Sequence, residues 1–172
     1  MHGFKIAVAT KDKALEDLIS FGTDITSSGD DSEQDSDESS VIDSAEIFFD
    51  TVDDNVKQKS GSMLARITIA GNVPQNPKFM KKFRKLTEWA RDKTSETQYR
   101  DICIAIKSSE TAFQVVYTFK EVFVLDYKEI YTSKSGEGSD RFELKLTQRE
   151  NNMNKIDILS DWPSDWEWAR KG

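Results

Sequence analysis

The chain has 172 residues and a formal net charge of −7, with 37% hydrophobic and 32% charged residues. This length suits a single domain whose core is large enough to be stable alone. No apolar run approaches the roughly 18 residues that a membrane helix needs, so membrane insertion is not expected. The N-terminus lacks the basic start, apolar stretch and cleavage site of a signal peptide, and we expect a cytoplasmic protein.

The first expected elements are two short strands. Apolar residues alternate with others at Phe4, Ile6 and Val8, and again from Ile19 to Ile25. Successive side chains of a strand point to opposite faces, so this alternation predicts strands that bury one face.

A strongly acidic segment comes next. From Asp24 to Asp54 the chain has 12 Asp or Glu residues and no Lys or Arg, and residues 27–40 contain no apolar side chain. Such a composition cannot bury enough surface to offset its ordering entropy, which predicts a flexible acidic insertion at about 26–62. Three functions stay open for it: a calcium loop, which lacks the central Gly and closing Glu; a phosphorylation cluster; and a strip that meets a basic surface, for example on a neighbouring subunit.

An apolar stretch lies inside this acidic segment, at residues 41–52. It fits a helix or a strand, because short apolar runs are ambiguous between the two. Its aromatic pair, Phe48 and Phe49, is a candidate docking surface. Packing on the chain's own domain is the alternative.

A strand from Met63 to Ile69 and a helix after Asn76-Pro77 are expected next, since Asn caps helices and Pro fits the first turn. Cations crowd the first half of this helix, where the helix dipole disfavours them. We therefore assign Lys81, Lys82 and Lys85 as candidate interaction residues, with an ordinary solvated basic face as the alternative. Nucleic-acid binding is not expected, because the patch is short and no recognition motif accompanies it.

The last third, from Asp101 to Ile158, is the clearest β region. Apolar side chains alternate with others along three runs: Ile102, Ile104 and Ile106; Phe113, Val115, Tyr117 and Phe119; Phe142, Leu144 and Leu146. Each run predicts a strand with one face on the core and the other in water. The single cysteine, Cys103, permits no internal disulfide and is expected to be a small buried residue.

Residues 160–172 form a tryptophan-rich tail after a β domain expected to span residues 1–159. Trp162, Trp166 and Trp168 are candidate interaction residues, because Trp is enriched at interface hot spots. Folding of the tail over its own domain is the alternative.

Signatures of catalysis are missing from the sequence. The only histidine is His2, so neither a His-based triad nor a multi-His metal site can be built. Neither a Gly-x-Ser-x-Gly elbow nor a phosphate-binding loop occurs. We expect no enzyme, no metal and no cofactor.

The order of elements, together with four apolar phrases, resembles a known family. The phrases are ARITIAG at 65–71, YRDICIAI at 99–106, YTFKEVFVLDY at 117–127 and FELKLTQ at 142–148. In these the chain is similar to the tube-protein superfamily, which includes the Hcp protein of type VI secretion, phage tail tube proteins and tube subunits of contractile injection systems. Small Firmicute tube-like proteins are especially similar. The acidic segment and the Trp-rich tail depart from the simple family pattern.

The resemblance implies a mainly β fold, a barrel or a sandwich of two antiparallel sheets with one flanking helix. It also implies that six copies form a ring and that rings stack into a hollow tube of a contractile injection or secretion apparatus, without catalysis. Implied partners are further copies of the chain, sheath, baseplate or spike proteins, and effector cargo, and the assembled apparatus would be exported. A monomeric or low-order adaptor or tube terminator of the same fold is the alternative.

Overall fold

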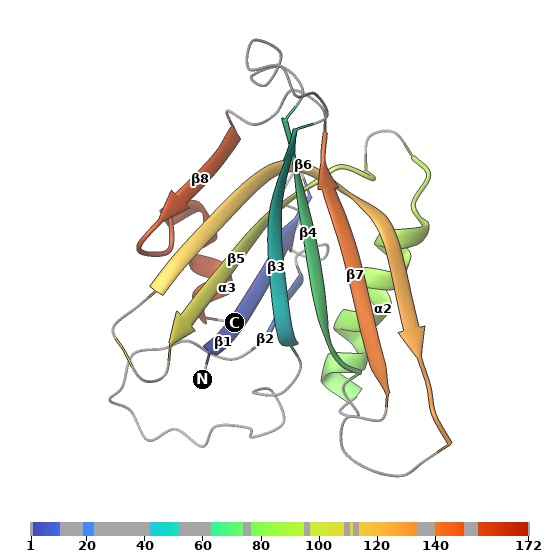
Figure 1. Cartoon of the computed structure of the whole chain (residues 1–172). Helices are drawn as coiled ribbons and strands as arrows, with labels where there is room; N and C mark the ends of the chain where they lie inside the picture. Colours follow the sequence, from blue (N-terminus) through green and yellow to red (C-terminus); the bar gives the residue numbers. More distant parts are fainter. Residues whose placement is uncertain are drawn as a thin grey trace.

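Figure 1 shows the computed structural model of the chain, which describes residues 2–10, 19–22, 42–51, 63–73, 77–94, 97–108, 111, 114–133, 140–149 and 155–171. The elements in chain order are β1 (His2–Ala9), β2 (Ile19–Gly22), β3 (Ile42–Thr51), β4 (Met63–Asn72), α2 (Pro77–Arg91), β5 (Arg100–Ser108), β6 (Gln114–Ile130), β7 (Arg141–Gln148), β8 (Ile156–Leu159), η3 (Ser164–Trp166) and α3 (Glu167–Lys171).

The described strands form one antiparallel sheet in the order β2-β1-β5-β6-β7-β4-β3, with β8 added beside β6. The sheet curls into a half-barrel, and α2 lies behind β4 and β7 while β8 and α3 lie on the opposite side (Figure 1). The expected mainly β fold with one flanking helix is confirmed. The described strands form a single curled sheet and not a sandwich of two separate sheets.

Strand β6 is long enough to belong to both halves of the curl. Residues 114–122 pair with β5, and residues 122–130 pair with β7. Near the end of the first stretch, Lys120 and Glu121 both lie opposite Asp101, which makes a β-bulge in the β5–β6 ladder. Glu121 has a φ of 54°, the left-handed conformation that bends a bulged strand.

Asp101 holds this bend with both carboxylate oxygens. One oxygen accepts a hydrogen bond from the backbone N–H of Glu121 at 3.1 Å, and the other lies 3.0 Å from the Lys120 ammonium. The end of β7 is tied to the same place, because the Gln148 side-chain amide donates to the Lys120 carbonyl at 3.1 Å. We call this arrangement the β6 corner.

The main core fills the inside of the curl. The predicted apolar faces of β1, β4, β5 and β7 all contribute to it, and α2 adds Phe83, Leu86 and Trp89. The Phe83 ring meets Phe142 of β7 edge to face, with centroids 4.7 Å apart. Because burying one such side chain stabilises a fold by about 1.5–3 kcal/mol, these contacts fix α2 on the sheet.

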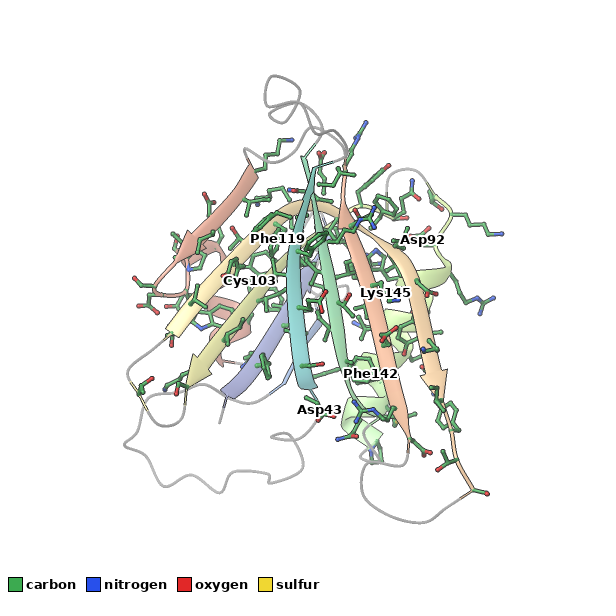
Figure 2. The ribbon with its side chains drawn as sticks, viewed as in Figure 1. Asp43, Asp92, Cys103, Phe119, Phe142 and Lys145 are labelled. Atoms are coloured by element: carbon green, nitrogen blue, oxygen red, sulfur yellow. The ribbon has the colours of Figure 1, made fainter. Side chains whose placement is uncertain are left out.

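A second buried cluster covers the outer face of β1 and β5. Trp162, Trp166 and Ala169 of the tail pack there on small side chains, namely Ala7, Ala9, Cys103, Ala105 and Val116. The expectation that the second face of residues 102–106 is wet was therefore wrong at Ala105, because the tail shields it. Cys103 is buried as expected, beneath the tail; Figure 2 shows it on β5.

Strand β7 follows the sequence expectation from Arg141 to Leu146, but the outward-facing Thr147 is buried, where its hydroxyl donates to the Ala65 carbonyl at 3.4 Å. Phe142, Leu144 and Leu146 are buried, whereas Arg141, Glu143 and Lys145 are at least partly exposed. Figure 2 labels Phe142 and Lys145 on this strand.

The segment expected as an acidic insertion contains one strand of the sheet. Residues 42–51 form β3, which pairs with β4 over its whole length. The strand option for this apolar stretch is thus the correct one, because its side chains alternate across the ladder: Ile47 lies opposite Ile67 and Phe48 opposite Arg66. Residues 23–41 and 52–62 lie outside the described residues.

Removing the carboxylate at the β6 corner should destabilise the whole domain. Asp101→Ala leaves the Glu121 N–H and the Lys120 ammonium without this acceptor, and we expect a loss of about 1–3 kcal/mol in the free energy of unfolding. Asp101→Asn keeps an acceptor oxygen and should cost less. Urea unfolding followed by circular dichroism measures both values.

The matched control is Lys145→Ala, which removes a solvent-exposed partner of Glu143 and should change stability by less than about 1 kcal/mol. Equal losses for Asp101→Ala and Lys145→Ala would contradict the role assigned to the corner.

Candidate assembly surfaces

The large apolar side chains that stay exposed lie mainly at strand edges. Among the described residues they are found on β3, on the second half of β6 and just after it, on β8, and once on α2: Phe48, Phe49, Leu125, Ile130, Tyr131, Ile158, Leu159 and Met80. An open strand edge carries unpaired backbone groups and can template pairing with another chain. These edges are therefore candidate assembly surfaces.

The β3 edge carries the aromatic pair that the sequence singled out. In the described part of the chain, β3 forms a ladder with β4 on one side. Phe48 is 52% exposed and lies opposite Arg66 on the outer face, whereas Phe49 lies opposite Ala65 on the core face. An incoming strand would thus find an aromatic ring on each face of the edge.

The strands β6, β7, β4 and β3 are neighbours in the sheet. The second half of β6 forms the edge of this group opposite β3. Residues 123–130 pair with β7, while the β5 and β8 ladders use residues 114–122. Leu125 is 57% exposed and is the extra residue between the paired Val124 and Asp126. Figure 1 shows this half of β6 as the outermost strand beside β7.

Three hydroxyl groups surround one carboxylate near the end of this β6 edge. The Tyr127 and Tyr131 hydroxyls donate to the two oxygens of Glu129 at 2.5 and 2.7 Å, and the Thr87 hydroxyl of α2 lies 3.4 Å from the first oxygen. The hydrogen bond to Glu129 raises the pKa of Tyr131 to about 12. Burial, followed by the same carboxylate, raises the pKa of Tyr127. Because the same carboxylate also accepts the hydrogen bond from Thr87, it ties α2 to the β6 edge.

The outer face of β6, β7 and β3 between the two edges is polar and mixed in charge. Glu143 lies 3.5 Å from Lys145 and 3.8 Å from Lys128, and Arg141 pairs with Asp43 at 2.6 Å. Exposed pairs of this kind add little stability. Because its side chains are charged and at least partly exposed, this face is suited to contact with water.

The predicted interaction residues fall on three separate elements. Phe48 and Phe49 lie on β3, and Lys81 is exposed on α2 beside the partly exposed Lys82 and Lys85. In the tail, Trp162 and Trp166 are buried against the chain's own sheet, and the half-buried Trp168 leans on Trp166. Docking of a partner by these residues stays a prediction.

Sequence reasoning missed the exposed residues of β6 and β8. The signal for the first was available: Val122, Phe123, Val124 and Leu125 are consecutive apolar residues, and one face of a strand takes only every second residue. The four residues of β8 offer no comparable signal.

The described part of the chain has neither a cluster of metal ligands nor a membrane-spanning helix. There, no three His, Cys, Asp or Glu side chains gather as a metal site, and no helix is long and apolar enough to cross a membrane.

Comparison with solved structures returns tube proteins. The chain is similar to Hcp1 from Flavobacterium johnsoniae (12% identity, TM-score 0.49, covering 91% of this chain and 95% of that one). It is also similar to Hcp1 from Salmonella typhimurium (10% identity, TM-score 0.46, covering 84% and 81%). A third similar chain belongs to the PVC sheath–tube complex, an extracellular contractile injection system (14% identity, TM-score 0.41, covering 91% and 88%).

Hcp and contractile injection systems are also named in the resemblance that the sequence phrases carry. No protein-family model and no curated protein matches the sequence. Because identity and TM-score are low, function has to be argued from the chain's own surfaces.

The tyrosine cluster predicts a loss of stability in alkali. The pKa of a tyrosine is near 10 in the unfolded chain, and that of Tyr131 is about 12 in the folded chain. The contribution of Tyr131 to the free energy of unfolding is therefore complete below pH 10. It is lost as the pH rises through about 12, since only the unfolded chain ionises in between. Melting temperatures from pH 8 to 12 test this, with Tyr131→Phe expected to flatten the decline.

Glu129→Gln is the companion variant, because it removes the charge that opposes ionisation. Tyrosine absorbance at 295 nm should then rise at lower pH than in the unaltered chain. An unchanged titration would show that Glu129 is not the cause.

The tail should protect Cys103. Burial raises the pKa of its thiol to about 12, so a thiol reagent should react slowly with the native protein. Deleting residues 160–172, or Trp166→Ala, should speed labelling many-fold, and the Trp166 change should cost about 3–5 kcal/mol. Labelling rates and urea unfolding, with exposed Asp165→Asn as the control, measure both effects. Unchanged labelling and stability would mean that the tail is not part of the domain.

Proposed function

We propose that the chain is a structural tube subunit of a phage-tail-like contractile injection or secretion apparatus. Copies join edge to edge into a ring, six to a ring as the resemblance implies, and rings stack into a hollow tube. Its partners are further copies, sheath, baseplate or spike proteins, and effector cargo. No reaction is involved, and the chain leaves the cytoplasm only within the assembled apparatus.

The observation that carries this proposal is a four-stranded half-sheet whose two outer strands each lack a second ladder among the described strands. It consists of residues 122–130 of β6, then β7, β4 and β3. Phe48 is exposed at one edge and Leu125 at the other. Exposed apolar side chains at both ends of one sheet favour a contact between the two different edges of neighbouring copies.

The strand directions fit this contact. All neighbours in the half-sheet are antiparallel, so β3 runs opposite to the second half of β6. A β6 edge from the next copy can therefore pair with β3 in the same antiparallel sense and continue the sheet. A head-to-tail contact of this kind closes into a ring when its rotation divides a full turn.

The two faces of the half-sheet differ in the way that a tube wall requires. Its core face is covered by the remainder of the domain and by α2, with Phe83 against Phe142. Its other face carries Lys128, Glu143 and Lys145. Since the bulk of each copy lies on the core side, closure puts that bulk outside and lines the lumen with the polar face.

Light scattering on separated fractions tests the proposal. At high protein concentration and low salt, the unaltered chain should have about six times its 19.6 kDa mass. Phe48→Lys and Leu125→Lys should each break the ring, while Lys93→Glu, at an exposed position just after α2, should leave it intact.

Mixing the two edge variants sharpens the test. Phe48→Lys retains a good β6 edge and Leu125→Lys a good β3 edge, so an equimolar mixture should give a heterodimer that cannot grow. A strict monomer for the unaltered chain contradicts the ring and favours the adaptor. Rings that survive both substitutions contradict the proposed edges.

A further inference from the structure

The first half of helix α2 carries charges that its own dipole disfavours. Its first turn contains no acidic residue, while cations stand at positions 78, 81, 82, 84 and 85. Cations near a helix N-terminus are unfavourable, and like charges four residues apart repel each other. Lys81 and Arg84 are exposed, and Lys82 and Lys85 are partly exposed. An anionic occupant of this basic face would offset both costs.

An oppositely charged segment is attached at the same end of the molecule. Residues 23–41 connect β2 to β3, and they contain seven Asp or Glu residues and no Lys or Arg. At the start of this connection, β2 packs against α2. At its end, Ile42 lies opposite Gly71 in the β4 ladder, six residues before the helix begins at Pro77.

The first described acid after the segment is already bound to a cation there. Asp43 accepts hydrogen bonds from Arg141 at 2.6 Å and from the side-chain amide of Asn72 at 3.4 Å. Figure 2 shows Asp43 at the end of β3 that follows the segment. One carboxylate at this end of the sheet thus already has a cationic partner.

The distances allow the segment to reach the helix. A chain spans at most about 3.3–3.6 Å per residue, so Pro77 lies within roughly 18 Å of Asn72. Residues 30–38 are 4 to 12 positions before Ile42 and can extend roughly 14–40 Å from it by the same measure. Short tethers give millimolar effective concentrations, which favours binding within one chain.

We propose that the basic face of α2, formed by Lys81, Lys82, Arg84 and Lys85, is a docking surface for the acidic residues 30–38 of the same chain. The contact is electrostatic and compensates the unfavourable charges of the helix. It is independent of the proposed ring, because neither open strand edge takes part in it.

Charge reversal on the helix gives opposite results with and without docking. Lys81→Glu together with Arg84→Glu places acids near the helix N-terminus, which alone favours the helix. If the acidic segment docks there, the same change creates repulsion and lowers the melting temperature. The helix double variant is made in two backgrounds. The first is the native chain, and in the second the six acids of 30–38 are replaced by amides: D30N, D31N, E33Q, D35N, D37N and E38Q.

We expect the helix double variant to lower the melting temperature in the native background and to raise it, or leave it unchanged, in the amide background. The difference should be about 2–4 °C at 20 mM NaCl and should shrink at 500 mM NaCl, where charges are screened. A control pair at the other end of the helix, Arg91→Glu with Lys93→Glu, should act equally in both backgrounds.

The experiment is run at 5 and 100 μM protein. A difference that is the same at both concentrations supports docking within the chain, whereas a difference seen only at 100 μM overturns it in favour of docking between copies. The same shift of the helix double variant in both backgrounds overturns the docking surface altogether.

Discussion

The whole architecture depends on the hydrogen bonds that Asp101 makes at the β6 corner. Its carboxylate binds the backbone N–H of Glu121 and the ammonium of Lys120, and it fixes two residues of β6 against one of β5. The bend allows a single strand to pair with β5 first and with β7 afterwards. Without the bend, β6 would continue along β5, and the half-sheet of β7, β4 and β3 would not fold back over the core.

The corner also determines which surfaces stay open. Because residues 123–130 leave β5 behind, one side of this stretch has no ladder partner among the described strands, and Leu125 is exposed there. At the other end of the half-sheet, β3 presents Phe48. The outer face of β5 is in turn left for the tail, where Trp166 packs on Cys103 and its small neighbours. One local bend thus accounts for the core, the covered face and the two open edges.

The sequence predicts the strands and the core well, since Ile102, Ile104 and Leu144 follow a simple alternation and are buried. It does not predict the corner. Residues 114–130 contain neither Gly nor Pro, and the left-handed residue is the ordinary Glu121, whose partner Asp101 lies 20 positions away. The sequence also does not predict whether the tail packs on its own domain or on a partner, because a tryptophan such as Trp166 suits both environments. Only the small size of Ala105 and Cys103 hinted at a covering layer.

Electron microscopy of the purified, concentrated protein shows whether β3 of one copy continues into β6 of the next. A reconstruction should show a closed ring with one unbroken sheet around its lumen, built from four strands of each copy, with Lys145 facing inward and α2 outside. Isolated monomers at every concentration, or rings whose copies meet through α2 or the tail, would contradict the account.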